Sequence, residues 1–172
     1  PSGRAANNYK TGVGILVDGA SGTIDISDNT TSENTDGIRV EDTDAAAFGD
    51  ITIHGNTVNN NEDKGIIAKN SDRISIAHNM MDGNKTGIWL ETSSDDVVKK
   101  NTITNSVENA IRLRNNSDNN TIKKNTIDGA GQSAVLVAAG SDSVMIRKND
   151  INDTGSDAIA LDGSMDSEIT GN

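Results

Sequence analysis

The segment KTGIWLETSSDDVVKKNTITNS, from Lys85 to Ser106, contains one unit of a repeat that runs along the chain. Its asparagine, Asn101, precedes a Thr-Ile pair, and its glycine, Gly87, precedes an Ile-Trp-Leu run. Equivalent residues recur about every 23 residues, seven times in all. The asparagines are Asn29, Asn56, Asn79, Asn101, Asn125, Asn149 and Asn172, and the small residues are Gly14, Gly37, Gly65, Gly87, Ala110, Ala134 and Ala158.

Two anchors in phase over seven copies indicate a repeat architecture. Each unit holds three short runs in which aliphatic and polar residues alternate, with the consensus G-I-x-V, then I-x-I, then N-x-I. Alternation with β-branched residues predicts strands, and a unit has no room for a helix of about ten residues. The sequence therefore predicts one all-β domain over residues 1–172, a single-stranded parallel β-helix of about seven coils.

Composition and charge limit the partners of such a domain. The chain of 172 residues carries 26 acidic and 15 basic side chains, a net charge of −11. This charge disfavours nucleic acid and anionic membranes as partners. The apolar runs are too short to span a bilayer, and the absence of cysteine excludes disulfide and thiol chemistry.

The repeated asparagine has a structural role in a stack of coils. Its amide can donate to the coil on one side and accept from the coil on the other, which forms a ladder. It can also satisfy backbone groups in the turn that follows I-x-I. We therefore expect these asparagines to stack inside the rod rather than to take part in catalysis.

The repeat resembles the parallel β-helix repeats of the pectate-lyase-like superfamily. Members include pectin and alginate lyases, polygalacturonases, mannuronan C-5 epimerases and NosD-type periplasmic repeat proteins. The resemblance covers Gly12 to Asn172. It implies a right-handed coil, an asparagine ladder between the second and third strands, and a polysaccharide site on the outer face of the first sheet.

The phase of the first strand predicts which side chains face outward. Ile88 and Leu90 take the interior, so we expect Trp89 on the outer face with an exposed indole. One outward column is Leu16, Arg39, Ile67, Trp89, Arg112, Leu136 and Ala160, and the other is Asp18, Glu41, Lys69, Glu91, Arg114, Ala138 and Asp162.

Two interpretations of this face are open. An exposed indole among charged groups suits an acidic sugar, because the ring packs on C–H groups while charged side chains bond hydroxyls and carboxylates. The expected substrate-binding residues are then Trp89, Arg39, Glu41 and Glu91. The alternative is structural, a cation–π pair between Trp89 and Arg112 with salt bridges between coils.

The resemblance to lyases and epimerases also implies a chemistry. A base removes the proton at C5 of a uronate while a cation or metal neutralises the carboxylate. The implied base is Lys or Arg, often with Ca²⁺, and the catalytic candidates are Lys69, Arg112 and Arg114. The Asp-Pro-His segment of the epimerases and the Gly-His-Gly segment of the polygalacturonases are absent. Whether the chain is a polysaccharide lyase, a C-5 epimerase or no enzyme is therefore open.

Other polar groups have structural explanations. His54 and His78 precede ladder asparagines, on a different face from the indole. Asp95-Asp96 lies in a turn where Ser-Asp recurs, so turn chemistry explains it. Calcium is an open alternative at the acidic turn Glu41-Asp42-Thr43-Asp44, because hard oxygen ligands suit this ion.

The ends of the sequence carry no recognisable cap. The chain stops at Asn172, midway through a coil, and its first residues, PSGRAANNYKTG, show no amphipathic helix. Bare coils expose strand edges. We therefore expect a fragment or module of a longer secreted protein, extracellular or periplasmic, that associates end to end.

Two functions remain open from the sequence. The leading one is a carbohydrate-recognising domain that binds or acts on an acidic polysaccharide such as alginate or pectate. The alternative is a non-catalytic spacer or adhesin shaft of a surface or secreted protein. A third function, ice binding, ranks last because Met80 and Asp150 interrupt the outward threonine column of Thr30, Thr57, Thr102 and Thr126.

Overall fold

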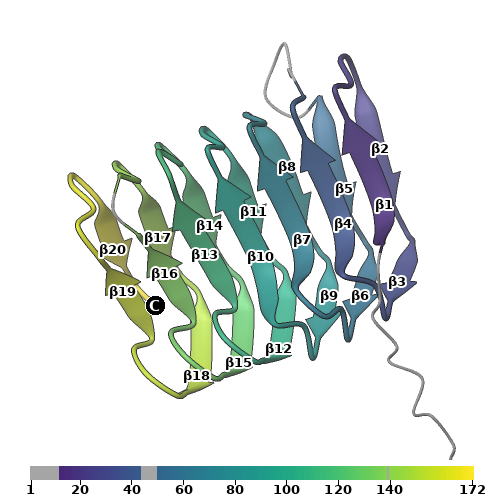
Figure 1. The fold of residues 1–172 in the computed structure, drawn as a ribbon. Coiled ribbons are helices and arrows are strands. Elements are labelled where there is room, and N and C mark those ends of the chain that lie inside the picture. The colour runs from purple at the N-terminus through teal and green to yellow at the C-terminus, as the bar shows by residue number, and fades with distance from the viewer. Residues whose placement is uncertain (1–11, 44–49, 139) are drawn as a thin grey trace, which may run out of the picture.

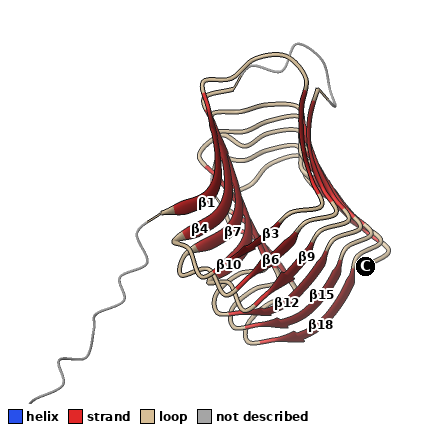
Figure 2. Ribbon diagram, turned by 90° about the vertical axis from the view of Figure 1, so that its right-hand side faces the viewer, coloured by secondary structure: helices blue, strands red, loops and turns tan. Residues whose placement is uncertain are grey.

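The computed structural model describes residues 12–43, 50–138 and 140–172, and every regular element in these ranges is a strand. The strands stack in three parallel sheets along one rod (Figure 1). Figure 2 shows the sheet of β1, β4, β7 and β10 as one wall of the coil, and the sheet of β3 to β18 as its base.

Each sheet takes one strand from each coil. The first sheet holds β1 (Val13–Asp18), β4 (Asp36–Glu41), β7 (Lys64–Lys69), β10 (Thr86–Glu91), β13 (Ile111–Arg114), β16 (Val135–Val137) and β19 (Ile159–Leu161). The second holds β2 (Ile24–Ser27), β5 (Ile51–His54), β8 (Ile74–Ala77), β11 (Val97–Lys99), β14 (Thr121–Lys123), β17 (Met145–Arg147) and β20 (Glu168–Thr170). The third holds β3 (Thr30–Ser32), β6 (Thr57–Asn59), β9 (Met80–Asp82), β12 (Thr102–Ser106), β15 (Thr126–Ala130) and β18 (Asp150–Thr154).

The predicted all-β parallel solenoid is confirmed, with a correction to its coil count. Two sheets have seven strands and the third has six, so the described residues make about six complete turns rather than seven. The first and last strand of each sheet have one neighbour each within the described ranges. Self-association through these edges stays a prediction.

Aliphatic side chains from all three sheets fill the interior. Ile38, Ile53 and Leu90 are 0% exposed, as the alternation of inward and outward residues requires. Gly87, at the start of β10, has a packing reason. A Cβ placed on it would lie 2.6 Å from the carbonyl oxygen of Ala110 in the next coil, so even alanine would require the backbone to shift there.

The asparagine ladder runs from Asn29 to Asn172 without a break. The backbone N–H and the Nδ2 of Asn79 both donate to Oδ1 of Asn101, over 2.9 and 3.0 Å. Asn101 repeats this with Asn125, and its Nδ2 also donates to the carbonyl of Ile76 over 3.0 Å. Each interior ladder amide is therefore buried with its hydrogen-bonding groups satisfied.

Replacing one interior ladder residue should destabilise the whole stack. Asn101→Leu removes the acceptor of the backbone N–H and Nδ2 of Asn79. It also removes the Nδ2 donor to the carbonyl of Ile76 and to Oδ1 of Asn125, and each orphaned buried group costs roughly 1–3 kcal/mol. Denaturant unfolding followed by circular dichroism measures the loss. Asn152→Leu, an exposed residue of β18, is the matched control, and equal losses in both variants would contradict a structural ladder.

Asp96 occupies a buried position in the turn between β10 and β11. Its Oδ1 accepts the backbone N–H of Ile74 over 2.8 Å, but its Oδ2 has no hydrogen-bond partner. Burial raises the pKa of the Asp96 carboxyl well above its usual range, and the charges of Asp72 and Asp95 raise it further, against the Ile74 hydrogen bond and Arg73. The Asp95-Asp96 pair is thus a turn feature, with one member inside the protein.

The raised pKa of Asp96 predicts a pH-dependent loss of stability. The folded protein keeps a proton that the unfolded chain releases above about pH 4, so the free energy of unfolding falls as pH rises from there to the folded pKa. Asp96→Asn should remove this slope and add roughly 1–3 kcal/mol at neutral pH, because an amide needs no desolvated charge. Unfolding measured from pH 4 to pH 8 tests this.

Asp128→Asn makes the same charge change at an exposed residue of β15 and should leave the slope unchanged. A slope that survives in the Asp96→Asn variant would show that other groups cause it.

Candidate functional site

The charged face of the first sheet carries the residues that the sequence singled out, and we call it the tryptophan face. It consists of Arg39, Glu41, Lys69, Trp89, Glu91, Arg112 and Arg114. The register places Arg39, Ile67, Trp89 and Arg112 in one column across β4, β7, β10 and β13. Glu41, Lys69, Glu91 and Arg114 form the adjacent column, as predicted.

Trp89 points outward as predicted, but the expected exposed indole is wrong. Ile88 and Leu90 are 0% exposed and belong to the core cluster, so the register of β10 is the predicted one. Trp89 nevertheless retains only 8% of its surface. It is covered from outside the coil rather than buried within it.

Three cations cover the ring of Trp89. The Lys64 ammonium lies 4.7 Å from the ring centroid, and the Arg112 and Arg114 guanidinium carbons each lie 4.8 Å from it. These distances are within the range of cation–π attraction. Lys64 was not among the residues predicted from the sequence. It is the first residue of β7, the strand that pairs with the strand of Trp89.

Glu91 connects the ring to one of these cations. Its Oε1 accepts from the Arg114 Nη2 over 2.7 Å and from Asn115 over 3.0 Å, and its Oε2 lies 3.4 Å from the Trp89 Nε1. Burial raises the pKa of the Glu91 carboxyl, but Arg114, Trp89 and Asn115 together outweigh this and lower the pKa below its ordinary value. Glu91 is therefore an ionised partner of Arg114.

Arg39 is neutralised by its own strand. Its guanidinium pairs with the carboxylate of Asp36, which is 1% exposed, and its Nη1 lies 3.5 Å from the Glu41 Oε2. Burial lowers the pKa of Arg39, but these carboxylates raise it by more, so the net shift is upward. Arg39 and Glu41 are thus engaged with each other, which leaves little of either charge for a ligand.

Arg112 differs from the other arginines of the tryptophan face. Within the described ranges it forms no ion pair and no hydrogen bond through its guanidinium, and its Nε is buried without a partner. Its guanidinium instead stacks on the ring of Trp89 through a cation–π contact. A rigid, partly buried cation without a counter-charge is a point at which an anionic group can bind.

The structure brings together only part of the predicted catalytic set. Arg112 and Arg114 lie two residues apart on β13 and both contact the indole. Lys69 lies on β7, two coils away, or about 10 Å along the rod. Glu91 and Trp89 of β10 lie between them.

Among the described residues, no three His, Asp or Glu side chains lie close enough together to hold a metal ion. The calcium candidate Glu41-Asp42-Thr43-Asp44 extends beyond these residues, because Asp44 lies outside the described ranges.

His54 contacts Asp25 over 3.0 Å on the second sheet, away from the tryptophan face. No helix long and apolar enough for a membrane span occurs in the ranges described.

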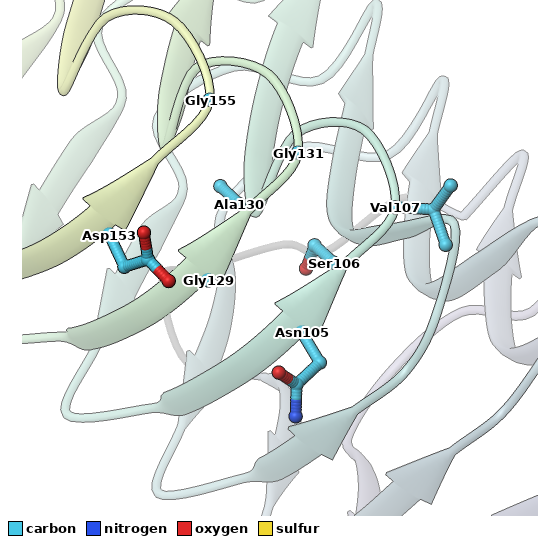
Figure 3. A pocket seen from close by; sticks show the side chains of 8 residues that line it. All are labelled: Asn105, Ser106, Val107, Gly129, Ala130, Gly131, Asp153 and Gly155. Carbon is cyan, nitrogen blue, oxygen red and sulfur yellow. The ribbon is translucent and has the colours of Figure 1, made fainter.

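An open hollow of about 350 Å³ lies elsewhere, where the third sheet turns back toward the first (Figure 3). Its floor is backbone, because a Cβ on Gly131 would lie 2.2 Å from the carbonyl oxygen of Val107. In Figure 3 the Asn105 side chain points away from this floor and Asp153 leans over Gly129. With one carboxylate and no cation in its lining, the hollow offers no constellation for uronate chemistry.

A protein-family comparison agrees with the coil geometry. The model of a family described as a right handed beta helix region matches residues 13–172. This description agrees with the right-handed coil that the resemblance to the pectate-lyase-like superfamily implies. A search of curated proteins finds no match to the chain.

Several solved structures share the fold. A protein assigned to the glycosyl hydrolases, from Parabacteroides merdae, has a TM-score of 0.59 at 13% identity, over 84% of this chain and 78% of its own. A double mutant of the periplasmic alginate epimerase AlgG has a TM-score of 0.68 at 18% identity, over 92% of this chain and 47% of its own. DFA-IIIase from Arthrobacter chlorophenolicus A6, without its lid, has a TM-score of 0.67 at 11% identity, over 92% and 49%. The chain thus spans about half of the last two, and identities this low show the fold alone.

The covered indole makes a spectroscopic prediction. Trp89 is the only tryptophan, so the native protein should emit at shorter wavelength than indole in water and resist quenching by acrylamide. The protein unfolded in guanidinium chloride provides the control in which the indole is fully accessible to acrylamide. Native quenching as strong as in the unfolded chain would contradict the cover of Lys64, Arg112 and Arg114.

Proposed function

Because the chain belongs to the right-handed β-helix family, we propose that its tryptophan face recognises an acidic polysaccharide, with Arg112 as the central contact. The observation that carries this proposal is the uncompensated guanidinium of Arg112. The other two arginines of the face have carboxylate partners, Asp36 and Glu41 for Arg39 and Glu91 for Arg114. A uronate carboxylate would supply the missing partner of Arg112 through charge-assisted hydrogen bonds.

The covered indole changes the role of Trp89 in this proposal. A ring with 8% of its surface exposed offers no platform for a sugar. It instead holds the Arg112 side chain over its face, so that the guanidinium is ordered before a ligand arrives. An ordered cation loses less conformational entropy on binding than a free one, which favours affinity.

The solved structures support the ligand class without defining it. Two of them are an alginate epimerase and a protein assigned to the glycosyl hydrolases, so this fold carries carbohydrate-related functions elsewhere. AlgG is periplasmic, which supports a periplasmic or extracellular place for this chain as part of the proposal.

Recognition is the function that the geometry supports best. Elimination or epimerisation at C5 would need a base and a neutralising cation on the same sugar. The candidate base Lys69 lies two coils from Arg112, with Trp89 and Glu91 in the intervening strand. We therefore assign Arg112 to carboxylate binding, since Glu91 already engages the neighbouring Arg114, and give Lys69 a supporting role toward a neighbouring sugar of the same chain.

Fluorescence titration tests the proposal. Oligogalacturonate or alginate should change the Trp89 emission, because Arg112 contacts both ligand and indole, whereas a neutral glucan should not. Arg112→Gln should weaken binding by about ten- to a hundredfold, since a hydrogen bond to a charged group is worth roughly 1.5–3 kcal/mol. Calorimetry gives the affinity independently of the fluorophore.

Arg39→Gln is the matched control on the same sheet. It removes the same charge from a residue that Asp36 and Glu41 already neutralise, so the affinity should hardly change while stability falls. No response to either polyuronate would favour the non-catalytic spacer or adhesin shaft. Appearance of the 4,5-unsaturated uronate absorbance during the titration would replace recognition with lyase activity.

A further inference from the structure

Six basic side chains form a second charged surface, which we call the cationic stripe. They come from three successive coils, at the last residue of β11, β14 and β17 and at the residue that follows each strand. The members are Lys99, Lys100, Lys123, Lys124, Arg147 and Lys148.

The stripe is regular because the coils stack in register. Lys99 pairs with Lys123, and Lys123 with Arg147, at the same position of the second sheet. Successive rows are therefore about 4.8 Å apart along the rod. A hollow of about 200 Å³ opens among Lys123, Lys124, Arg147 and Lys148, so the charges surround a space and do not simply project from a flat surface.

The stripe lacks counter-charges. In the part of the chain that the structure describes, none of its six members forms an ion pair, although the protein as a whole carries a net charge of −11. Burial lowers the pKa of Lys123, and the charges of Arg147, Lys99 and Lys124 lower it further. Like charges are thus held close together without a carboxylate to relieve their repulsion.

Three of the lysines also occupy strained backbone positions. Lys100, Lys124 and Lys148 have φ angles of 54°, 55° and 55°, in the left-handed region. Side chains other than Gly, Asn and Asp adopt this region at a cost in free energy. Equivalent positions in the other coils hold Asp28, Gly55, His78 and Gly171, residue types that adopt this region more often than lysine does. Gly or Asp at these positions would lower the free-energy cost of the left-handed conformation. A lysine kept there in three coils therefore points to a function for its side chain.

We propose that the cationic stripe binds a linear acidic polysaccharide lying along the rod, whose anionic groups meet successive rows of lysine and arginine. A polymer with repeating charges fits three successive basic rows better than a single small anion does. Thr102 and Thr126 follow the stripe on the outer face of the third sheet, exposed and aligned, and their hydroxyls suit the hydroxyl groups of sugars.

Nucleic acid fits the same surface less well. The remaining surface of a protein with net charge −11 repels a densely charged polymer. Binding of single strands uses aromatic side chains on which bases stack. Trp89 is the only tryptophan, tyrosine or phenylalanine among the described residues, and it lies on the first sheet rather than beside the stripe.

This inference shares its ligand class with the proposed function but none of its residues. The stripe lies on the second sheet and the tryptophan face on the first, so each can be removed without touching the other.

The test is a triple variant, Lys100→Asn with Lys124→Asn and Lys148→Asn. Binding of an end-labelled oligogalacturonate is measured by fluorescence anisotropy over a series of salt concentrations. The variant should bind at least about tenfold more weakly at low salt, and the slope of log affinity against log salt should fall by about two, for three lost contacts at roughly 0.7 each. Its thermal unfolding temperature should rise, because Asn tolerates the left-handed conformation.

The control is the triple Lys→Arg variant at the same positions, which keeps the charge and should retain binding. An Asn variant that binds like the parent overturns the inference. Complete displacement of the oligomer by inorganic phosphate at the same total concentration of negative charge also overturns it. So does tighter binding of single-stranded DNA or anionic phospholipid vesicles than of the oligomer. Loss of the Trp89 fluorescence response in Arg112→Gln, with full anisotropy binding in the lysine variant, would retain the proposed function and reject the stripe.

Discussion

The stacking of coils through hydrogen bonds in exact register is the constraint on which the rest of this structure depends. Each ladder asparagine joins its coil to the next through both its backbone and its side chain, as Asn79 does with Asn101 and Asn101 with Asn125. A shift of one residue in any coil would break these bonds and turn that coil's aliphatic residues outward. The packing of the interior thus decides which residues of each strand face outward.

This constraint converts a sequence repeat into columns of side chains. Residues about one period apart become neighbours at the strand spacing, whatever their chemistry. A column of mixed charge then neutralises itself, as Glu91 and Arg114 do on the tryptophan face. A column of one charge, such as Lys99, Lys123 and Arg147, contains no carboxylate that could neutralise it, and we propose an external anionic partner there. The rod therefore presents two chemically different surfaces on two of its sheets.

The period of the sequence was enough to predict the fold, the ladder and the outward columns, because these depend only on phase. It could not predict the burial of Trp89, which depends on how far Lys64, Arg112 and Arg114 reach from adjacent coils. The stripe was missed although its signal is visible: a basic pair precedes the ladder asparagine in VKKN, IKKN and IRKN. The turn residues form a column for the same reason as the strand residues, because both recur at the period of the coil.

The ladder also explains how strained lysines persist beside it. The backbone N–H of Lys100 donates to the carbonyl of Lys123 over 3.2 Å, and Lys124 repeats this with Arg147. The next residue in each case is a ladder asparagine, bonded through its backbone and its amide. With the turn held on both sides, the left-handed conformation is imposed whatever side chain it carries. Stability supplied by the asparagines thus leaves the preceding position free to carry charge, so that one turn combines a buried ladder amide with an exposed cation.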